Sequence, residues 1–300
     1  MLLAVVALAL QVAAGATAFV VITLSSGDST EAARRLIFNP WTLLPILAFS
    51  VGTVLALGLR ATREPARQFF QMHPFAPGLV PAVIVTSTGV AIFMHEIDNW
   101  ILHTLSVVAG ADKLSPDFLD MAAAPVGAFL VAVLAAPLLE EYFFRGLILR
   151  GLLVHGRPLR AVLFSALLFG IAHGNLRQFV IGFVLGSASG WWYERTRSVG
   201  PGMIGHAVVN GVTWVAALLP KPAARLGLVR PPGMVVHEPG WLFLIGLVLI
   251  AVGVWRFHRR AIDIEPGTSW PQAYRSLDEP PVLEQPVPPE LPPLLEPTAD

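Results

Sequence analysis

Cysteine is absent from this 300-residue chain, and charged residues make up only 13% of it. The absence of cysteine excludes disulfide bonds, thiolate metal sites and a cysteine nucleophile. Soluble domains carry about 25% charged residues, so the shortage of charge excludes an ordinary soluble enzyme and a nucleic-acid binder with a basic face. Twenty Lys and Arg balance twenty Asp and Glu, which leaves no net charge to attract acidic partners.

Hydrophobic residues are abundant, at 55% of the chain, and the mean hydropathy is +0.66. A helix needs about 20 mostly apolar residues to cross a bilayer. The sequence therefore predicts an all-α, polytopic membrane bundle of about eight transmembrane helices. The apolar runs are 1–24, 41–60, 78–108, 121–152, 160–174, 176–194, 201–219 and 240–257.

The first of these runs, 1–24, resembles a signal peptide because Ala16-Thr17-Ala18 is similar to a cleavage site. No Lys or Arg precedes the apolar stretch, however, so the charged segment that begins a signal peptide is missing. We interpret residues 1–24 as a membrane helix.

Basic residues in the predicted loops favour cytoplasmic termini. The loops on the cytoplasmic side would carry Arg60, Arg63, Arg67, Arg150, Arg157, Arg160, Arg195, Arg197, Arg256, Arg259 and Arg260. The outer loops would carry fewer basic residues: Arg34, Arg35, Lys113, Arg177, Lys221, Arg225 and Arg230. The high Ala, Arg, Pro and Gly content suggests a GC-rich bacterium, so we expect the protein in a bacterial inner membrane.

The chain divides into four predicted parts. Residues 1–120 form N-terminal transmembrane helices, and residues 121–219 form a core that carries the polar motifs. Residues 220–263 form an extended, periplasmic-type loop and a last transmembrane helix. Ten prolines lie in the segment 264–300, which cannot bury enough apolar surface to fold and is predicted to be a disordered tail.

Three charged residues lie deep in the apolar run 121–152, although each costs about 2.5–3.5 kcal/mol on insertion scales. Glu141 and Arg145 are four residues apart, so they share a helix face and can pair. Glu140 points about 100° away from Glu141 and remains available for chemistry. A purely structural network of the two acids and Arg145 is the alternative.

Two further motifs lie on the following helices. His173 follows Phe169 by four residues, and both Glu140 and His173 lie ~18–20 Å from the turn between their helices at 1.5 Å per residue. An antiparallel hairpin would therefore bring Glu140 and His173 to the same depth. His206 and Asn210 share one face of the next helix. A packing histidine and an interhelical hydrogen-bonding pair are the simpler alternatives.

Gly182, Gly186 and Gly190 recur every four residues between these motifs, which indicates close helix packing. The segment that begins His95-Glu96 lacks the second histidine of a zinc pair, because Asn99 stands in its place. We interpret that segment as the outer part of a long helix.

The ordered triple of motifs resembles the CPBP group, the type II CAAX prenyl endopeptidases and bacteriocin-processing enzymes also called the Abi family. The resemblance covers roughly residues 120–220 and rests on Glu140-Glu141-x-x-x-Arg145, Phe169-x-x-x-His173 and His206-x-x-x-Asn210. It implies a helical bundle that encloses a polar intramembrane cavity, and endopeptidase activity on a peptide or membrane-protein substrate.

The resemblance also implies the catalytic roles. Glu140 would be the general base, and His173 would orient the attacking water. His206 and Asn210 would donate hydrogen bonds to the oxyanion. The supporting residues would be Glu141, Arg145 and Phe169.

A metal is the open question, because the family is commonly labelled metalloprotease. Glu140, His173 and His206 could be three zinc ligands with an open fourth position. We favour a metal-free, glutamate-activated water. Two other functions stay open: a proton-coupled transporter, for which no internal symmetry is visible, and a non-catalytic membrane scaffold of the same family.

Overall fold

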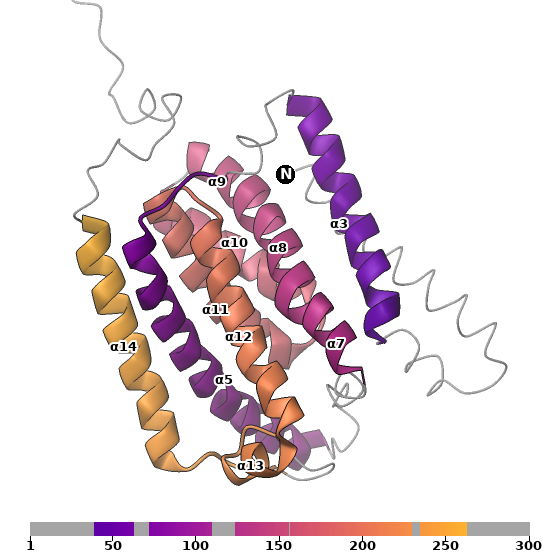
Figure 1. Ribbon diagram of the computed structural model, residues 1–300, viewed down its shortest axis with the longest axis vertical. Coiled ribbons are helices and arrows are strands. Elements are labelled where there is room, and N and C mark those ends of the chain that lie inside the picture. Colours follow the sequence, from indigo (N-terminus) through magenta and orange to yellow (C-terminus); the bar gives the residue numbers. More distant parts are fainter. Residues whose placement is uncertain (1–38, 63–71, 110–123, 156, 230–234, 263–300) are drawn as a thin grey trace, which may run out of the picture.

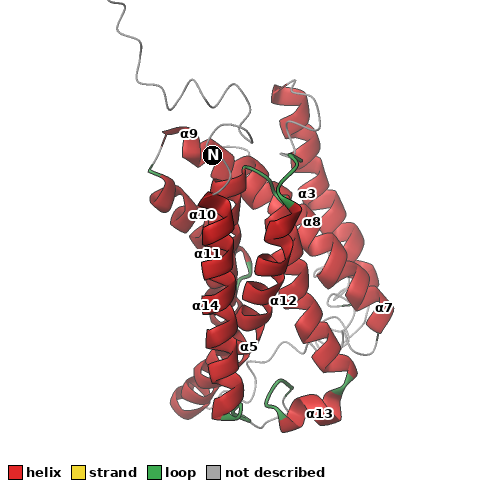
Figure 2. Ribbon diagram, turned by 60° about the vertical axis from the view of Figure 1, so that its left-hand side comes forward, coloured by secondary structure: helices red, strands yellow, loops and turns green. Residues whose placement is uncertain are grey.

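The computed structural model describes residues 39–62, 72–109, 124–155, 157–229 and 235–262 (Figures 1 and 2). Helices and short turns account for these ranges, without a strand, so the all-α prediction is confirmed. The long helices outside the central segment are α3 (Pro40–Thr62), α5 (Val80–Ala109), α10 (Pro158–Ala172), α11 (Leu176–Thr196), α12 (Gly200–Leu218) and α14 (Gly240–Ile262). The single turn η1 (Pro77–Leu79) leads into α5, and α13 (Pro220–Arg225) follows α12.

The central segment is one continuous helix from Pro125 to His155 with two π-helical stretches. Its parts are α7 (Pro125–Ala128), η2 (Phe129–Ala135), α8 (Ala136–Glu141), η3 (Tyr142–Leu149) and α9 (Arg150–His155). The short α8 therefore lies between two widened turns, a type of distortion that is frequent at functional sites.

A membrane bundle is confirmed, but a count of eight spans is not. Within the described ranges, four helices are long and apolar enough to cross a bilayer: Pro40–Arg60, Pro77–Leu105, Pro125–Leu153 and Gly240–Ala261. At 1.5 Å per residue the 15-residue α10 spans about 22 Å, less than a hydrocarbon core of about 30 Å. The predicted helix 1–24 and the predicted tail 264–300 lie outside the described residues.

Helix α5 lies between α14 and α12 (Figure 1) and packs along both of them. Helices α10 and α11 form an antiparallel hairpin, and α12 lies against the central helix. The glycine stripe of α11 faces α10: a Cβ on Gly186 would lie 3.0 Å from Ala166 Cα, and one on Gly190 would lie 2.9 Å from Val162 Cγ1. The prediction that this stripe serves packing is confirmed.

Two of the sequence-based placements are wrong. Arg177, predicted in an outer loop, lies half-buried in the first turn of α11 and is paired with Asp98. The predicted extended loop after α12 instead contains α13, because Pro220 stands at the first helical position, where proline is favoured. That segment then returns to α5 through Glu238, which is buried.

Candidate active site

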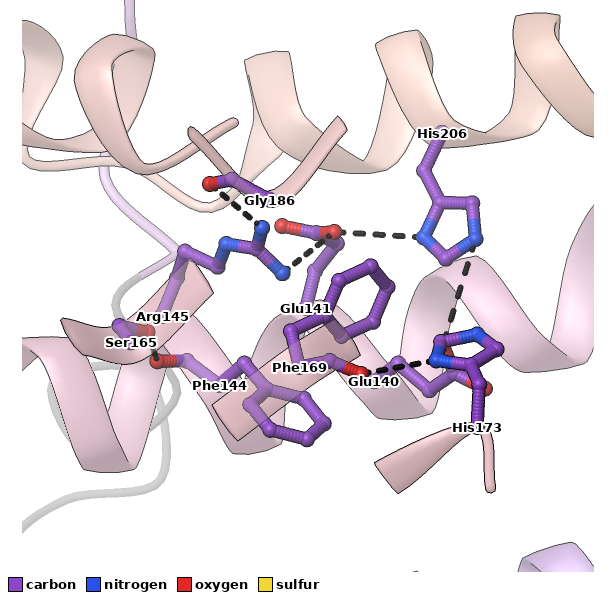
Figure 3. Close-up of polar contacts among 9 residues, drawn as sticks. All are labelled: Glu140, Glu141, Phe144, Arg145, Ser165, Phe169, His173, Gly186 and His206. Atoms are coloured by element: carbon purple, nitrogen blue, oxygen red, sulfur yellow. Dashed lines mark hydrogen bonds and ion pairs between the residues drawn. The ribbon is translucent and has the colours of Figure 1, made fainter. Parts of the chain in front are cut away.

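Three helices bring the predicted polar residues together inside the bundle (Figure 3). Glu140 and Glu141 come from α8, His173 from the end of α10, and His206 from α12. The close-up shows Glu141 between Arg145 and His206, with Glu140 and His173 on the other side of the Phe169 ring. Side chains that are up to 66 residues apart in sequence therefore share one site.

Glu141 and Arg145 form the predicted salt bridge, with Nη1 2.9 Å from Oε1 and both side chains fully buried. Arg145 Nη2 also donates to the Gly186 carbonyl at 2.9 Å, and its guanidinium lies 4.8 Å from the centre of the Phe169 ring. A buried ion pair persists only when such additional contacts offset its desolvation. Arg145 thus balances the charge of Glu141 and ties α11 to the central helix.

Glu140 points away from this pair, as the helical geometry predicts. Its side chain is 19% exposed, and its Oε2 atom has no hydrogen-bond partner among the described residues. Oε2 lies 4.0 Å from His206 Nε2, too far for a direct hydrogen bond. One oxygen of Glu140 is therefore left for a water molecule or a substrate.

His206 lies between the two carboxylates. Its Nδ1 is 3.3 Å from Glu141 Oε1, and because that oxygen also accepts from Arg145, we assign the proton to Nδ1. The opposite nitrogen, Nε2, then faces Glu140. Helix α12 approaches closely here, since a Cβ on Gly202 would lie 2.5 Å from Glu141 Oε2.

His173 lies at the end of α10 in the turn that leads to α11, and not within the helix as predicted. The helix stops because Gly174 adopts a left-handed conformation with φ of +72°. His173 Nδ1 donates to the Phe169 carbonyl at 2.8 Å. A carbonyl can only accept, so the neutral ring keeps its lone pair on Nε2.

Phe169 separates the two histidines. Its ring centre lies 4.9 Å from that of His173 and 5.6 Å from that of His206, and both contacts are edge-to-face. Phe169 is fully buried. The third predicted supporting residue therefore fixes the two imidazole rings by packing.

Asn210 binds the central helix, and the reason lies in the π-helical stretch η2. The N–H of Ala136 donates to the carbonyl five residues earlier, Val131. The next carbonyl, of Ala132, would in the same pattern face Pro137, which has no N–H. Asn210 Nδ2 donates to Ala132 O instead, at 2.7 Å, which leaves one N–H of the amide for another acceptor.

These motifs fall within a recognised family segment. Residues 122–212 match the family model described as type II CAAX prenyl endopeptidase Rce1-like. The segment 122–212 is thus similar to the Rce1-like family. The resemblance drawn from the three motifs is thereby confirmed.

A curated relative is named as a membrane peptidase. The Bacillus subtilis (strain 168) protein named "Putative membrane peptidase YdiL" is 24% identical over 180 residues, which cover 60% of this chain and 72% of that protein. No solved structure matches the chain at a significant level.

The alternative zinc site would require Glu140, His173 and His206 to share one metal ion. Across the described ranges, no three His, Asp or Glu side chains are placed to hold a metal ion. Two ligands of one tetrahedral zinc lie about 3.4 Å apart, whereas Glu140 Oε2 and His206 Nε2 are 4.0 Å apart. Glu141 Oε1 binds Arg145 and His206, whereas its Oε2 is buried without a hydrogen-bond partner among the described residues.

Sequence reasoning missed a polar layer next to the Rce1-like segment. Asp98 and Glu96, interpreted as the outer part of a long helix, are buried. Asp98 pairs with Arg177, and Glu96 binds His237 at 2.7 Å. The signal in the sequence was the run of polar residues at 95–99 in an otherwise apolar helix, but their partners lie 79 and 141 residues away.

Proposed function

We propose that this protein is an intramembrane endopeptidase that hydrolyses a peptide bond with a water molecule activated by Glu140. The observation that carries the proposal is the free Oε2 of Glu140, beside a second carboxylate that Arg145 already balances. The Rce1-like match supports a CAAX-type intramembrane protease in general.

The first step is attack by water on the peptide carbonyl carbon. Glu140 accepts a proton from the water, and the lone pair on His173 Nε2 accepts the hydrogen bond that orients it. The proton then passes to the amine nitrogen as the C–N bond breaks. His173 holds its Nδ1 proton on Phe169 O throughout, so its Nε2 remains directed to the reacting water.

The second requirement is a donor for the oxyanion. Because His206 directs its Nδ1 proton at Glu141, and a neutral ring carries one proton, Nε2 can donate to the oxyanion only in the doubly protonated ring. Glu141 stabilises this doubly protonated ring, as the carboxylate does in Ser-His-Asp hydrolases. Asn210 supplies its remaining amide N–H.

The substrate class and location follow from the setting. We propose a peptide or membrane-protein substrate within the bilayer, without a nucleic-acid partner; whether the substrate is prenylated depends on residues beyond the hydrolytic motifs.

The beginning of α5 and the end of α14 meet at one end of the bundle (Figure 1), where Gly78 lies against Arg260. Basic residues at this end support cytoplasmic termini in a bacterial inner membrane.

Cleavage by the purified full-length chain tests the proposal. We would compare wild type, Glu140→Gln and His173→Ala on a library of membrane-protein and prenylated peptide substrates. Each substitution is expected to reduce kcat by about 10²–10⁴-fold. Glu194→Gln is the matched control, because Glu194 pairs with Arg195 on α11 at the helix end remote from His173.

Two outcomes would contradict this mechanism. Full activity in a folded Glu140→Gln variant would remove Glu140 from the reaction. Loss of wild-type activity in a strong chelator, restored by zinc, would replace the glutamate-activated water with a metal-bound one.

A further inference from the structure

Asp98 and Arg177 form a bidentate ion pair between α5 and the first turn of α11. Arg177 Nε and Nη2 donate to the two carboxylate oxygens of Asp98, each at 2.5 Å. The side chains are only 7% and 18% exposed. Bidentate arginine–carboxylate pairs fix orientation as well as distance, so this contact sets where α11 begins relative to α5.

The beginning of α11 also sets the place of His173. Asn175 caps the helix by accepting the N–H of Gln178 at 2.9 Å, and its Nδ2 donates to the His173 carbonyl at 3.3 Å. A Cβ on Gly182 would lie 3.4 Å from His173 Nδ1, so α11 also packs against the imidazole. The turn and the first residues of α11 therefore behave as one unit that carries His173.

Helix α5 also contacts α12, the helix that carries His206. It packs along α12, and His95 Nε2 lies 3.4 Å from Thr213 Oγ1. A Cβ on Gly205, next to His206, would lie 2.8 Å from Ser87 Oγ. The same helix thus contacts the supports of both His173 and His206.

We propose that Asp98 and Arg177 are positioning residues that fix His173 relative to Glu140 and His206. The inference rests on the proposed peptidase function. The hydrogen bonds of the His173 side chain and carbonyl that the structure shows are local, to Phe169 and Asn175. The ion pair is a polar contact that connects the beginning of α11, next to this turn, to α5. A catalytic group displaced by about 1 Å can cost 10²-fold in rate.

The test measures geometry and turnover separately in the full chain. Because the protein has no cysteine, two spin labels can be placed at Ile171→Cys and Val215→Cys, which are 51% and 47% exposed on α10 and α12. Double electron–electron resonance then reports the distance distribution between the His173 turn and α12. Asp98→Asn is the main variant, and Arg177→Lys keeps the charge while losing the bidentate geometry.

We expect Asp98→Asn to broaden the distance distribution and to lower kcat about 10-fold or more, with KM within about twofold of wild type. Arg177→Lys should have a smaller effect on both, and Glu194→Gln should change neither. A wild-type distribution, or a broadened distribution with unchanged kcat, would overturn the proposal. If wild type cleaves no substrate but Asp98→Asn still broadens the distribution, the peptidase function fails while the structural role of the pair stands.

Discussion

The molecule holds two pairs of neighbouring carboxylates inside the bundle, and the two pairs have different partners. In the Glu140–Glu141 pair, Arg145 balances one acid, and the other keeps a free oxygen and partial exposure. In the Glu96–Glu238 pair, Glu96 accepts from Asn99, His237 and the backbone N–H of Glu238.

In the second pair, protonation of Glu238 relieves the repulsion between the two carboxylates. Glu238 lies just before the membrane span of α14, and neither of its carboxylate oxygens has a hydrogen-bond partner among the described residues. Burial, together with the nearby charge of Glu96, raises the pKa of Glu238 to about 8. Arg145 thus balances the negative charge of Glu141 in the first pair, whereas protonation removes the negative charge of Glu238 in the second pair.

The largest effect is expected from Arg145→Met, which removes the counter-ion of the first pair. Glu141 would remain buried without it, and breaking a buried pair in this way costs about 3–5 kcal/mol in the free energy of unfolding. Denaturant unfolding in detergent measures this loss. Arg195→Met, which breaks the more exposed pair with Glu194, should cost at most about 1 kcal/mol; equal losses in both would contradict the distinction.

Glu141→Gln tests the role of charge in the first pair more gently. The amide can still accept from His206 Nδ1 but cannot stabilise a doubly protonated ring, so we expect kcat to fall on the order of 10²-fold. Steady-state cleavage kinetics measure this effect. Unchanged kcat with an intact fold would mean that Glu141 serves only to hold Arg145.

Gly202→Ala tests how closely α12 must approach the first pair. The new Cβ would lie 2.5 Å from Glu141 Oε2, and such overpacking costs about 1–3 kcal/mol. Gly211→Ala is a control on the same helix, because its Cβ would lie 3.9 Å from its nearest neighbour. That control should gain up to about 1 kcal/mol from helix propensity; a similar gain at Gly202 would refute the close approach.

The effect of pH concerns the second pair. Because folding raises the pKa of Glu238 from 4.5 to about 8, its contribution to stability is fully present below pH 4.5 and is lost as the pH rises through 8. Glu238→Gln should remove this part of the pH dependence. Thermal unfolding of both proteins between pH 4 and 9 measures it; parallel curves would contradict the raised pKa.

Local spacing predicted much of the site, and long-range packing supplied the rest. The Glu141–Arg145 pair follows from their spacing of four residues along a helix. The common depth of Glu140 and His173 follows from the number of residues between each of them and the turn that joins their helices. The Asp98–Arg177 contact could not be predicted in this way, because 79 residues separate its partners. The hydrogen bond from Asn210 to the Ala132 carbonyl depends on a π-helical pattern, which the hydrophobic periodicity of the sequence does not reveal.

The wide turns of the central helix affect how this protein can change in evolution. A one-residue deletion within Phe129–Ala135 could restore ordinary α-helical hydrogen bonding, and the apolar helix would still suit a membrane. Such a deletion would also remove the widened turn in which the Ala132 carbonyl accepts from Asn210. Single-residue deletions in this stretch should therefore be neutral for insertion and destructive for activity, which makes alignment gaps here a marker of lost function.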